Sequence, residues 1–363
     1  SALSQSGLSV PGHLFAQVIP DLAGDSKYYS FLHCDGAGTK SIIAYLMFQE
    51  TGDPECFAGL AQDALVMNLD DVFCLGLPSS LALANLIARN LKLIGDPVLQ
   101  RIFSSYRMLT EQLADLGVPI ALCGGETADC GDIVRTLVVD AVLSGRIARS
   151  RLIDNSRISA GDVIIGFSST GQTAYERELN SGISANGMSL ARHALLSRNK
   201  ISDLRHVVDP ELELHSAYSG PYAILDVPEE LGISVGQALL SPTRTYAPVL
   251  ARIYQSLESS GRMESIHAAI HCTGGGQTKV LRFGTGLHFV KNNLFEAPPL
   301  FRLIQQHAEV SWHEMYQVFN MGHRFELYVA DSIADSIISI AREFDLDAKE
   351  IGYVKSGISA SAT

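Results

Sequence analysis

The sequence has few charged residues and an excess of acidic ones. Only 18% of its 363 residues are charged, and 27 Lys and Arg stand against 39 Asp and Glu, which gives a formal net charge of −12. Phosphate backbones and anionic lipids repel such a chain, so we expect neither nucleic acid nor a membrane as its main partner. An anionic substrate would need local help from Lys, Arg, backbone N–H groups or a metal ion.

Paired cysteines and long apolar runs are also missing. The six cysteines are scattered without a C-x-x-C pair, which is typical of a reducing compartment, so we expect a cytoplasmic protein. The longest uncharged run, residues 72–88, contains Gly76 and Pro78. Because it is shorter than the roughly 20 apolar residues that span a bilayer, we expect no membrane span.

Length and hydrophobicity predict two domains. The chain is longer than a single core of ordinary size. Hydrophobic residues make up 47% of it and the mean hydropathy is +0.15, which indicates extensive burial, some of it in a subunit interface. We place the domain boundary near residue 156, so the expected domains are residues 1–155 and 156–363.

Strands and helices alternate in both halves of the pattern, which predicts an α/β or α+β protein. Ser241 followed by Pro242 predicts a helix start, because Ser caps a helix and Pro fits its first turn. The expected strands cover residues 28–34, 118–123, 133–143, 163–167, 266–271, 324–330 and 350–354. The expected helices cover residues 55–75, 98–116, 312–319 and 332–344.

The stretch D-G-A-G-T-K follows the first expected strand and has the composition of a phosphate site. Asp35 can hold Mg²⁺, and Gly36 and Gly38 let the backbone approach a ligand closely. Thr39 and Lys40 can hydrogen-bond and neutralise phosphate oxygens. The stretch lacks the spacings of a P-loop or of G-x-G-x-x-G, and the alternative is a tight turn with an exposed lysine.

A second stretch repeats this design, with Gly124 and Gly125 followed by Glu126 and Thr127. The helix over residues 55–75 adds further acids, listed with the others below. Carboxylates gathered near strand ends repel one another unless a divalent cation compensates, so we predict a Mg²⁺ site. Its candidate ligands are Asp35, Asp63, Asp71 and Glu126.

A glycine-rich turn, Thr273–Gly276, precedes an expected helical segment. Its N–H groups could hold phosphate at the helix N-terminus, and the alternative is a turn that needs positive φ angles. His33, His271 and His323 show no metal-ligand spacing, so we expect them to be structural.

Together these motifs resemble the phosphoribosylformylglycinamidine cyclo-ligase family over residues 29–354. The family's D-G-V-G-T-K corresponds to residues 35–40 and its G-G-E-T-A-E to residues 124–129. S-N-G, A-L-L-x-P-T-R, H-x-T-G-G-G and F-N-x-G correspond to residues 185–187, 238–244, 271–276 and 319–322. The resemblance implies a two-domain fold like that of selenophosphate synthetase, with a mixed sheet and packed helices in each domain.

The resemblance implies that ATP phosphorylates the formyl-amide oxygen of formylglycinamidine ribonucleotide and that the amidine nitrogen then closes the imidazole ring. It assigns catalytic roles to Asp35, Lys40 and Asp71, with ATP and Mg²⁺ as cofactors. The implied ATP- or phosphate-binding residues are Gly36, Gly38, Thr39, Gly124, Gly125, Thr127, Asn186, Gly187, Thr273, Gly274 and Gly275. A homodimer is implied too, with its N-terminal domains packed together and the ATP cleft near their interface.

The sequence departs from the family at four places, and the first is the family's N-terminal K-D-A-G-V-D segment, which is not recognisable in residues 1–20. Ser184 replaces the family's histidine before S-N-G, residues 172–183 form an insertion, and His323-Arg324-Phe325 replaces Ile-Gly-Met. Glu176 and Arg177 in the insertion could take over the work of that histidine, and the alternative is a solvated loop. Two rival functions remain: thiamine-monophosphate kinase or selenophosphate synthetase activity, and a nucleotide-binding homologue without turnover.

Overall fold

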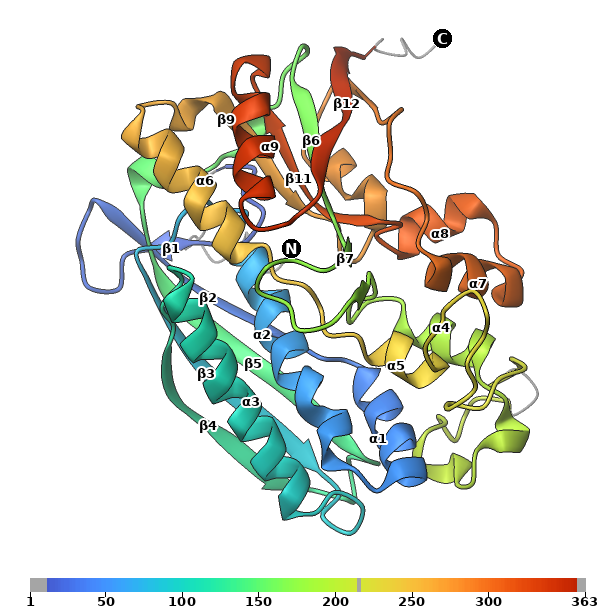
Figure 1. Cartoon of the computed structure of the whole chain (residues 1–363). Helices are drawn as coiled ribbons and strands as arrows, with labels where there is room; N and C mark the ends of the chain where they lie inside the picture. Colours follow the sequence, from blue (N-terminus) through green and yellow to red (C-terminus); the bar gives the residue numbers. More distant parts are fainter. Residues whose placement is uncertain (1–11, 214–216, 358–363) are drawn as a thin grey trace.

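The computed structural model describes residues 12–213 and 217–357, so the first eleven residues of the expected N-terminal domain lie outside it. The first sheet has the strand order β1-β2-β5-β3-β4 (Figure 1). Strands β3 and β4 are parallel, and the other described neighbours in this sheet are antiparallel. The strands are β1 Ile19–Pro20, β2 Tyr28–Gly36, β3 Ser80–Arg89, β4 Ala121–Asp129 and β5 Leu137–Ala148.

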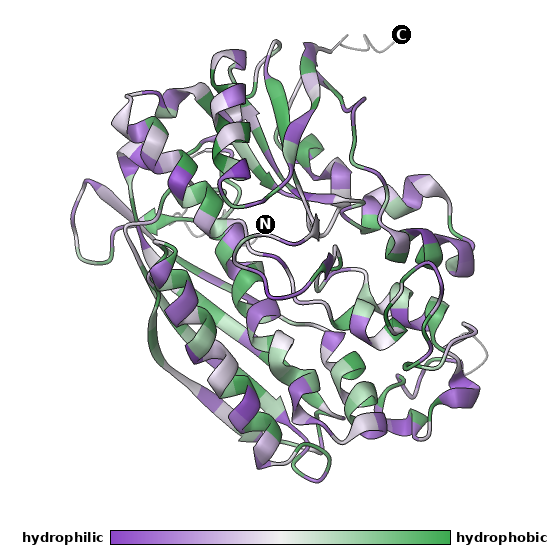
Figure 2. Cartoon of the chain, in the orientation of Figure 1, coloured by the Kyte–Doolittle hydropathy of each residue, from purple (hydrophilic) through white to green (hydrophobic). Residues whose placement is uncertain are grey.

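Three helices cover one face of this sheet: α1 Lys40–Thr51, α2 Ala58–Phe73 and α3 Asp96–Asp115 (Figure 1). Polar residues along α3 alternate with apolar ones that recur at helical spacing, as Figure 2 shows, so one side of α3 packs inward. Helix α2 contacts β2 and β5 on one side and elements of the second half on the other. It therefore lies at the centre of the molecule.

The opposite face of the first sheet, here called the outer face, carries large apolar side chains. Leu32, Leu86 and Val138 alternate along their strands with buried residues and are 71%, 42% and 36% exposed. Because side chains alternate between the faces of a sheet, these three point away from the helices. No described helix of the chain shields them.

The second sheet has the order β10-β12-β6-β11-β9, and all of its described pairings are antiparallel. Helices α6 Ala247–Ser259 and α9 Ala334–Arg342 pack against each other, and α9 also contacts the sheet (Figure 1). The strands are β6 Val163–Ser168, β9 Ile266–His271, β10 Leu287–Val290, β11 His323–Val329 and β12 Ala348–Ser356.

Shorter elements complete the second half. Helices α4 Met188–Leu195, α5 Val235–Leu240, α7 Pro299–Ala308 and α8 Trp312–Val318 pack beside α1 and beside one another. Strands β7 Thr170–Gly171 and β8 Asn180–Ser181 form a small pair. Short 3₁₀ segments lie at 54–57, 149–151, 155–157, 198–200, 204–206, 263–265, 276–282 and 331–333. A single large hydrophobic cluster includes residues from both halves, so the two sheets are joined by a continuous apolar core.

The α/β class is confirmed, with four local corrections. The strand expected at 118–123 begins at Ala121 and continues through the G-G-E-T stretch, and β3 was not predicted. The expected mixed sheet holds for the first half, whereas the second sheet is antiparallel throughout its described strands. The predicted helix start at Ser241 is wrong, because α5 ends at Leu240 and α6 begins at Ala247.

Within the part of the chain that the structure describes, no helix is long and apolar enough to cross a bilayer.

Candidate active site

The end of β2 delivers Asp35 to the side of the first sheet that faces α2. Its Oδ1 accepts a hydrogen bond from the Gly36 N–H at 2.7 Å. Burial raises the pKa of Asp35, and the nearby charge of Asp71 adds to this effect. Gly36 has a steric reason to be glycine, because a Cβ there would lie 1.8 Å from Asp140 Oδ1 on β5. Asp140 is a further acid near the end of β2 that was not predicted from the sequence, and like Val138 it points to the outer face.

Asp71 lies between two histidines near the end of α2. Its Oδ1 is 2.6 Å from His271 Nδ1, and its Oδ2 is 3.3 Å from His33 Nε2. Arg324 Nε donates to His271 Nε2 at 3.1 Å, so the His271 proton lies on Nδ1 and is donated to Asp71. Burial opposes ionisation of Asp71, but the hydrogen bonds from His271 and His33 outweigh it and lower its pKa. Asp71 is therefore a carboxylate at neutral pH.

Lys40 and Asp63 pair with each other in the interior. Lys40 Nζ is 2.9 Å from Asp63 Oδ1 and donates to the Ser241 carbonyl at 2.5 Å. Thr243 donates to the same Asp63 oxygen through its hydroxyl at 2.6 Å and its N–H at 2.9 Å. Both charged side chains are buried. Phosphate binding by Lys40 and metal binding by Asp63 stay predictions, and the contacts seen favour a structural role for this pair.

Glu126 lies far from the other predicted metal ligands. It is exposed on β4, in register with Leu86, and its side chain points to the outer face. Two strands, β5 and β3, separate β4 from β2. With neighbouring strands about 4.8 Å apart, Glu126 and Asp35 are separated by roughly 14 Å and lie on opposite faces. A single chain, in its described part, therefore does not gather the predicted set of four carboxylates.

The glycine-rich turn after β9 adopts the conformation that its composition predicts. Gly274, Gly275 and Gly276 have φ angles of +52°, +120° and +50°. A Cβ on Gly276 would lie 2.4 Å from the Tyr316 carbonyl oxygen, so no other residue fits there. The segment that follows, Gly276–Arg282, is a 3₁₀ helix.

Other predicted phosphate residues lie beside this turn. A Cβ on Gly274 would approach Asn186 Oδ1 to 4.0 Å, and Gly187 caps α4 with a φ angle of +74°. Thr39 Oγ1 lies 3.4 Å from Ser189 Oγ in the first turn of α4. The 35–40 stretch, the start of α4 and the 273–276 turn therefore converge from both halves of the chain. We call the place where these three segments meet the mouth of the site. Gly124, Gly125 and Thr127 lie apart from this mouth, on β4.

Lys279 is a cation of the site that was not predicted from the sequence. Its Nζ lies 3.5 Å from Thr273 Oγ1, and its positive charge acts on both Asp35 and Asp71. The available signal was its position, three residues beyond the glycine-rich turn. The mouth thus combines two carboxylates, one ammonium, hydroxyls and glycine backbone, which suits a metal-bound polyphosphate.

Two family models match the chain. The N-terminal domain of AIR synthase related proteins matches residues 16–147, and the C-terminal domain of the same family matches residues 243–362. The chain belongs to this family. A phosphoribosylformylglycinamidine cyclo-ligase from Methanococcus vannielii is 29% identical over 332 residues, which cover 91% of the chain and 79% of that relative.

Two solved structures share the fold at low sequence identity. PurL from T. maritima, complexed with FGAR, superimposes with a TM-score of 0.54 at 16% identity. The match covers 94% of the chain but only 44% of the longer PurL chain. A thiamine-monophosphate kinase from Stenotrophomonas maltophilia has a TM-score of 0.51 at 16% identity, with 94% of the chain and 86% of the kinase covered.

The insertion expected in this AIR synthase related chain is held in place by a buried ion pair. Glu176 Oε2 lies 2.5 Å from Arg244 Nη2, and Oε1 accepts from Arg244 Nε at 2.9 Å. Arg177 is exposed, and Ser184 is buried with its hydroxyl accepting from the Asn186 N–H at 3.4 Å. Because Arg244 occupies both oxygens of Glu176, this geometry argues against a free proton acceptor there.

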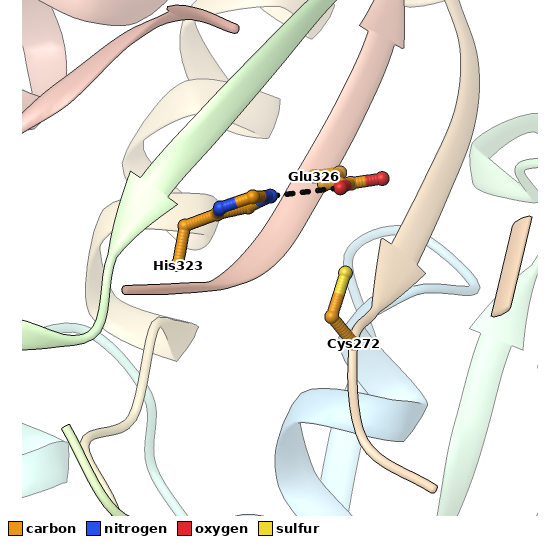
Figure 3. A group of neighbouring side chains, drawn as sticks. All are labelled: Cys272, His323 and Glu326. Atoms are coloured by element: carbon orange, nitrogen blue, oxygen red, sulfur yellow. Dashed lines mark hydrogen bonds and ion pairs between the residues drawn. The ribbon is translucent and has the colours of Figure 1, made fainter. Parts of the chain in front are cut away.

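Residues 323–325, which replace the family's Ile-Gly-Met, include His323, and His323 belongs to a buried polar network behind the glycine-rich turn. Cys272, His323 and Glu326 form the group within the described residues whose donor atoms are close enough for a metal (Figure 3). Glu326, however, already accepts from His323 Nε2 at 2.9 Å and from Lys291 Nζ at 2.5 Å. The Lys291 ammonium thus supplies the positive charge that a metal would bring, so we interpret the group as structural.

Proposed function

We propose that the protein closes the imidazole ring of 5-aminoimidazole ribonucleotide from formylglycinamidine ribonucleotide, with ATP converted to ADP and phosphate. This ligase reaction belongs to purine biosynthesis, and we place it in the cytoplasm. The observation that carries the proposal is the similarity to a cyclo-ligase over 91% of the chain. The convergence of Asp35, Asp71 and Lys279 with the glycine-rich turn supports it.

The residues of the mouth fit the two chemical steps. In the first, the γ-phosphoryl group of ATP passes to the formyl-amide oxygen and ADP leaves. In the second, the amidine nitrogen attacks the activated carbon, the C–O bond breaks and phosphate leaves. Thr39, the N–H groups of the turn and Lys279 are placed to stabilise charge on the transferring group. A mouth that fixes both ends of the substrate also favours ring closure.

Mg²⁺ is the metal that this donor set fits. Asp71 stays ionised, and its charge disfavours ionisation of Asp35, so a cation between them would relieve the repulsion. Carboxylate oxygens are the ligands that Mg²⁺ prefers, and the ion would neutralise phosphate charge. Asp35 and Asp71 would hold it from one chain.

A homodimer would complete this site. The outer face of the first sheet is open and apolar, and sheets pack face to face in many assemblies. A two-fold axis that runs along the strands would lay β4 of one copy over β2 of the other. Glu126 of the partner subunit would then approach the end of β2 that carries Asp35. This arrangement would remove the separation between Glu126 and Asp35 that the strand order imposes within one chain.

The test is ADP release by the purified protein with Mg²⁺. We expect release on addition of formylglycinamidine ribonucleotide and none with thiamine phosphate or without an acceptor. Thiamine-phosphate-dependent release would instead support the kinase alternative, and no release with either acceptor would support a homologue without turnover.

A further inference from the structure

The two histidines that flank Asp71 are held in different ways. His271 donates from Nδ1 to Asp71 Oδ1 at 2.6 Å, and its Nε2 accepts from Arg324, so the protein engages both of its ring nitrogens. His33 lies on the other side of the carboxylate, with Nε2 3.3 Å from Asp71 Oδ2. The His271 side chain is fully buried, whereas that of His33 is 21% exposed. The longer contact, at His33, is therefore the accessible one.

Asn68 fixes the tautomer of His33. The Asn68 amide nitrogen donates to three backbone carbonyl oxygens, at 3.1, 2.8 and 3.1 Å, which belong to Asp35, Ala64 and Ala141. Because these partners are all acceptors, the other end of the carboxamide is its oxygen. This oxygen lies 2.9 Å from His33 Nδ1, which must therefore carry a proton and donate it. Neutral His33 then presents the lone pair of Nε2 to the site.

This arrangement is typical of a histidine that binds a metal ion. Metal-bound imidazoles usually donate their other N–H to a carbonyl or carboxylate oxygen, which orients the ring. Ligands at right angles around an ion with bonds of about 2.1 Å are about 3.0 Å apart, close to the 3.3 Å between His33 Nε2 and Asp71 Oδ2. Asp35 lies two residues beyond His33 on the same face of β2. A cation there would take the place of the proton that joins His33 to Asp71.

We propose that His33 is a nitrogen ligand of the cation at the mouth, and that the site therefore prefers a transition-metal dication such as Mn²⁺ to Mg²⁺. This inference rests on the cation site of the proposed function. The carboxylates of Asp35 and Asp71 alone suit a hard ion such as Mg²⁺, whereas an imidazole adds affinity for first-row transition metals. The sequence spacing did not indicate this role, because only the fold brings Asp71 on α2 to His33 on β2.

The alternative is an ion pair in which a proton alone joins His33 to Asp71, and the two accounts predict opposite effects of removing the imidazole. His33→Asn keeps a side-chain N–H for Asn68 but lacks Nε2. If His33 is a ligand, equilibrium binding of Mn²⁺ to the full-length variant should weaken about 10- to 100-fold, and that of Mg²⁺ less than about 3-fold. If His33 only neutralises Asp71, both ions should bind the variant at least as tightly as the wild type, which would overturn the proposal.

Pulsed electron paramagnetic resonance of Mn²⁺ bound to the protein without nucleotide gives a readout that does not depend on turnover. The wild type should show hyperfine coupling to a directly bound nitrogen, and the coupling should change when the histidines carry the heavy nitrogen isotope. His33→Asn should lose the coupling. His271→Asn is the matched control and should keep it, because the protein engages both nitrogens of His271. Coupling that persists in His33→Asn, or that is absent from the wild type, would overturn the proposal.

These outcomes separate the nitrogen ligand from the proposed function. ADP release that depends on formylglycinamidine ribonucleotide, without nitrogen coupling, would overturn the ligand and leave ring closure intact. Nitrogen coupling without ADP release in the presence of either cation would support the ligand and reject ring closure. Thermal unfolding checks that His33→Asn is folded. The isotope measurement uses the wild type alone, so it tests the proposal even if that variant does not fold.

Discussion

Acidic residues on α2 each have a different partner, and this division sets their roles. Asp63 faces Lys40 and Thr243, and Asp71 faces the two histidines of the mouth. Asp70 is fully buried, accepts from the Tyr246 N–H at 3.1 Å and lies 3.3 Å from Arg324 Nη2. Of the three, only Asp71 keeps measurable exposure beside the mouth. It is therefore the best candidate to act on a ligand.

The first prediction concerns Asp71. Asp71→Asn removes the negative charge at nearly constant shape, so the fold should persist while turnover falls about 100- to 1,000-fold. ADP release at saturating ATP measures the loss, and circular dichroism checks the fold. Normal turnover with normal dependence on Mg²⁺ would mean that other acids of the chain bind the metal.

The second prediction concerns Glu326 and the pH dependence of the stability that it contributes to the fold. Burial would raise its pKa, but the charge of Lys291 and the hydrogen bond from His323 lower it from 4.5 to about 2. An acid with a depressed pKa stabilises the fold above its unfolded pKa, and this stabilisation disappears as the pH falls toward the folded value. Glu326→Gln should cost about 3 to 5 kcal/mol at neutral pH, because it leaves the mostly buried Lys291 ammonium without its counter-ion.

Urea unfolding of both proteins between pH 7 and pH 2 provides the measurement. The difference in free energy of unfolding between wild type and Glu326→Gln should be constant above about pH 5 and shrink between about pH 4.5 and 2. A difference that did not change with pH would contradict the charge-based account.

At the scale of elements, the segment over residues 241–246 crosses α2 and joins the two halves. Lys40 donates a hydrogen bond to the Ser241 carbonyl, and the Thr243 hydroxyl donates to Asp63. Asp70 accepts from the Thr245 hydroxyl at 3.1 Å. These partners lie some 175 to 201 residues away in sequence. A Ser-Pro pair is locally a good helix start, but these contacts hold the chain extended, which is why the local prediction failed.

The difference between local sequence signals and tertiary contacts also decides how much of the site could be predicted from the sequence. The glycine-rich turn at 274–276 was predicted because turn chemistry is a local property, whereas Asp71 was chosen among the acids of its helix by the resemblance to the cyclo-ligase family. Lys279 and Arg324 were missed because only tertiary contacts bring them to the mouth. The separation of Glu126 from Asp35 depends on strand order, which no local pattern encodes.

The third prediction separates a structural from a metal-binding role for Asp63. Asp63→Asn leaves the Lys40 ammonium buried without a charged partner, so it should destabilise the fold by about 3 to 5 kcal/mol. Chemical denaturation with and without Mg²⁺ measures this effect. The double variant Asp63→Asn with Lys40→Met should recover part of the loss. If the cost of Asp63→Asn appears only when Mg²⁺ is present, Asp63 is a metal ligand.

At the scale of the whole molecule, the two halves share one hydrophobic cluster, yet the first sheet is covered on one face only. We predict a particle of about twice 39.2 kDa by light scattering at micromolar concentration. Leu86→Glu should shift it to the monomer, because the charge falls on the open sheet face. Leu225→Glu, at a residue of similar exposure in the second half, is the control. A monomeric wild type would exclude the interface.

The last prediction concerns active sites to which both subunits of the dimer contribute. If Glu126 of the partner subunit completes the site that holds Asp71, then Glu126→Gln and Asp71→Asn should each be inactive as homodimers. A heterodimer of the two variants contains one site with both carboxylates intact and one site that lacks both. At equal amounts with free subunit exchange, half of the dimers are mixed and half of their sites work.

Mixing the two inactive variants should therefore restore about a quarter of wild-type turnover, as measured by ADP release after co-expression or after dilution and reassembly. Adding Leu86→Glu to both variants should abolish the recovery, because it blocks the interface through which the site is shared. No recovery in mixtures that light scattering shows to exchange subunits would mean that Glu126 does not act across the interface. In that case the Mg²⁺ site would consist of Asp35 and Asp71 from one chain.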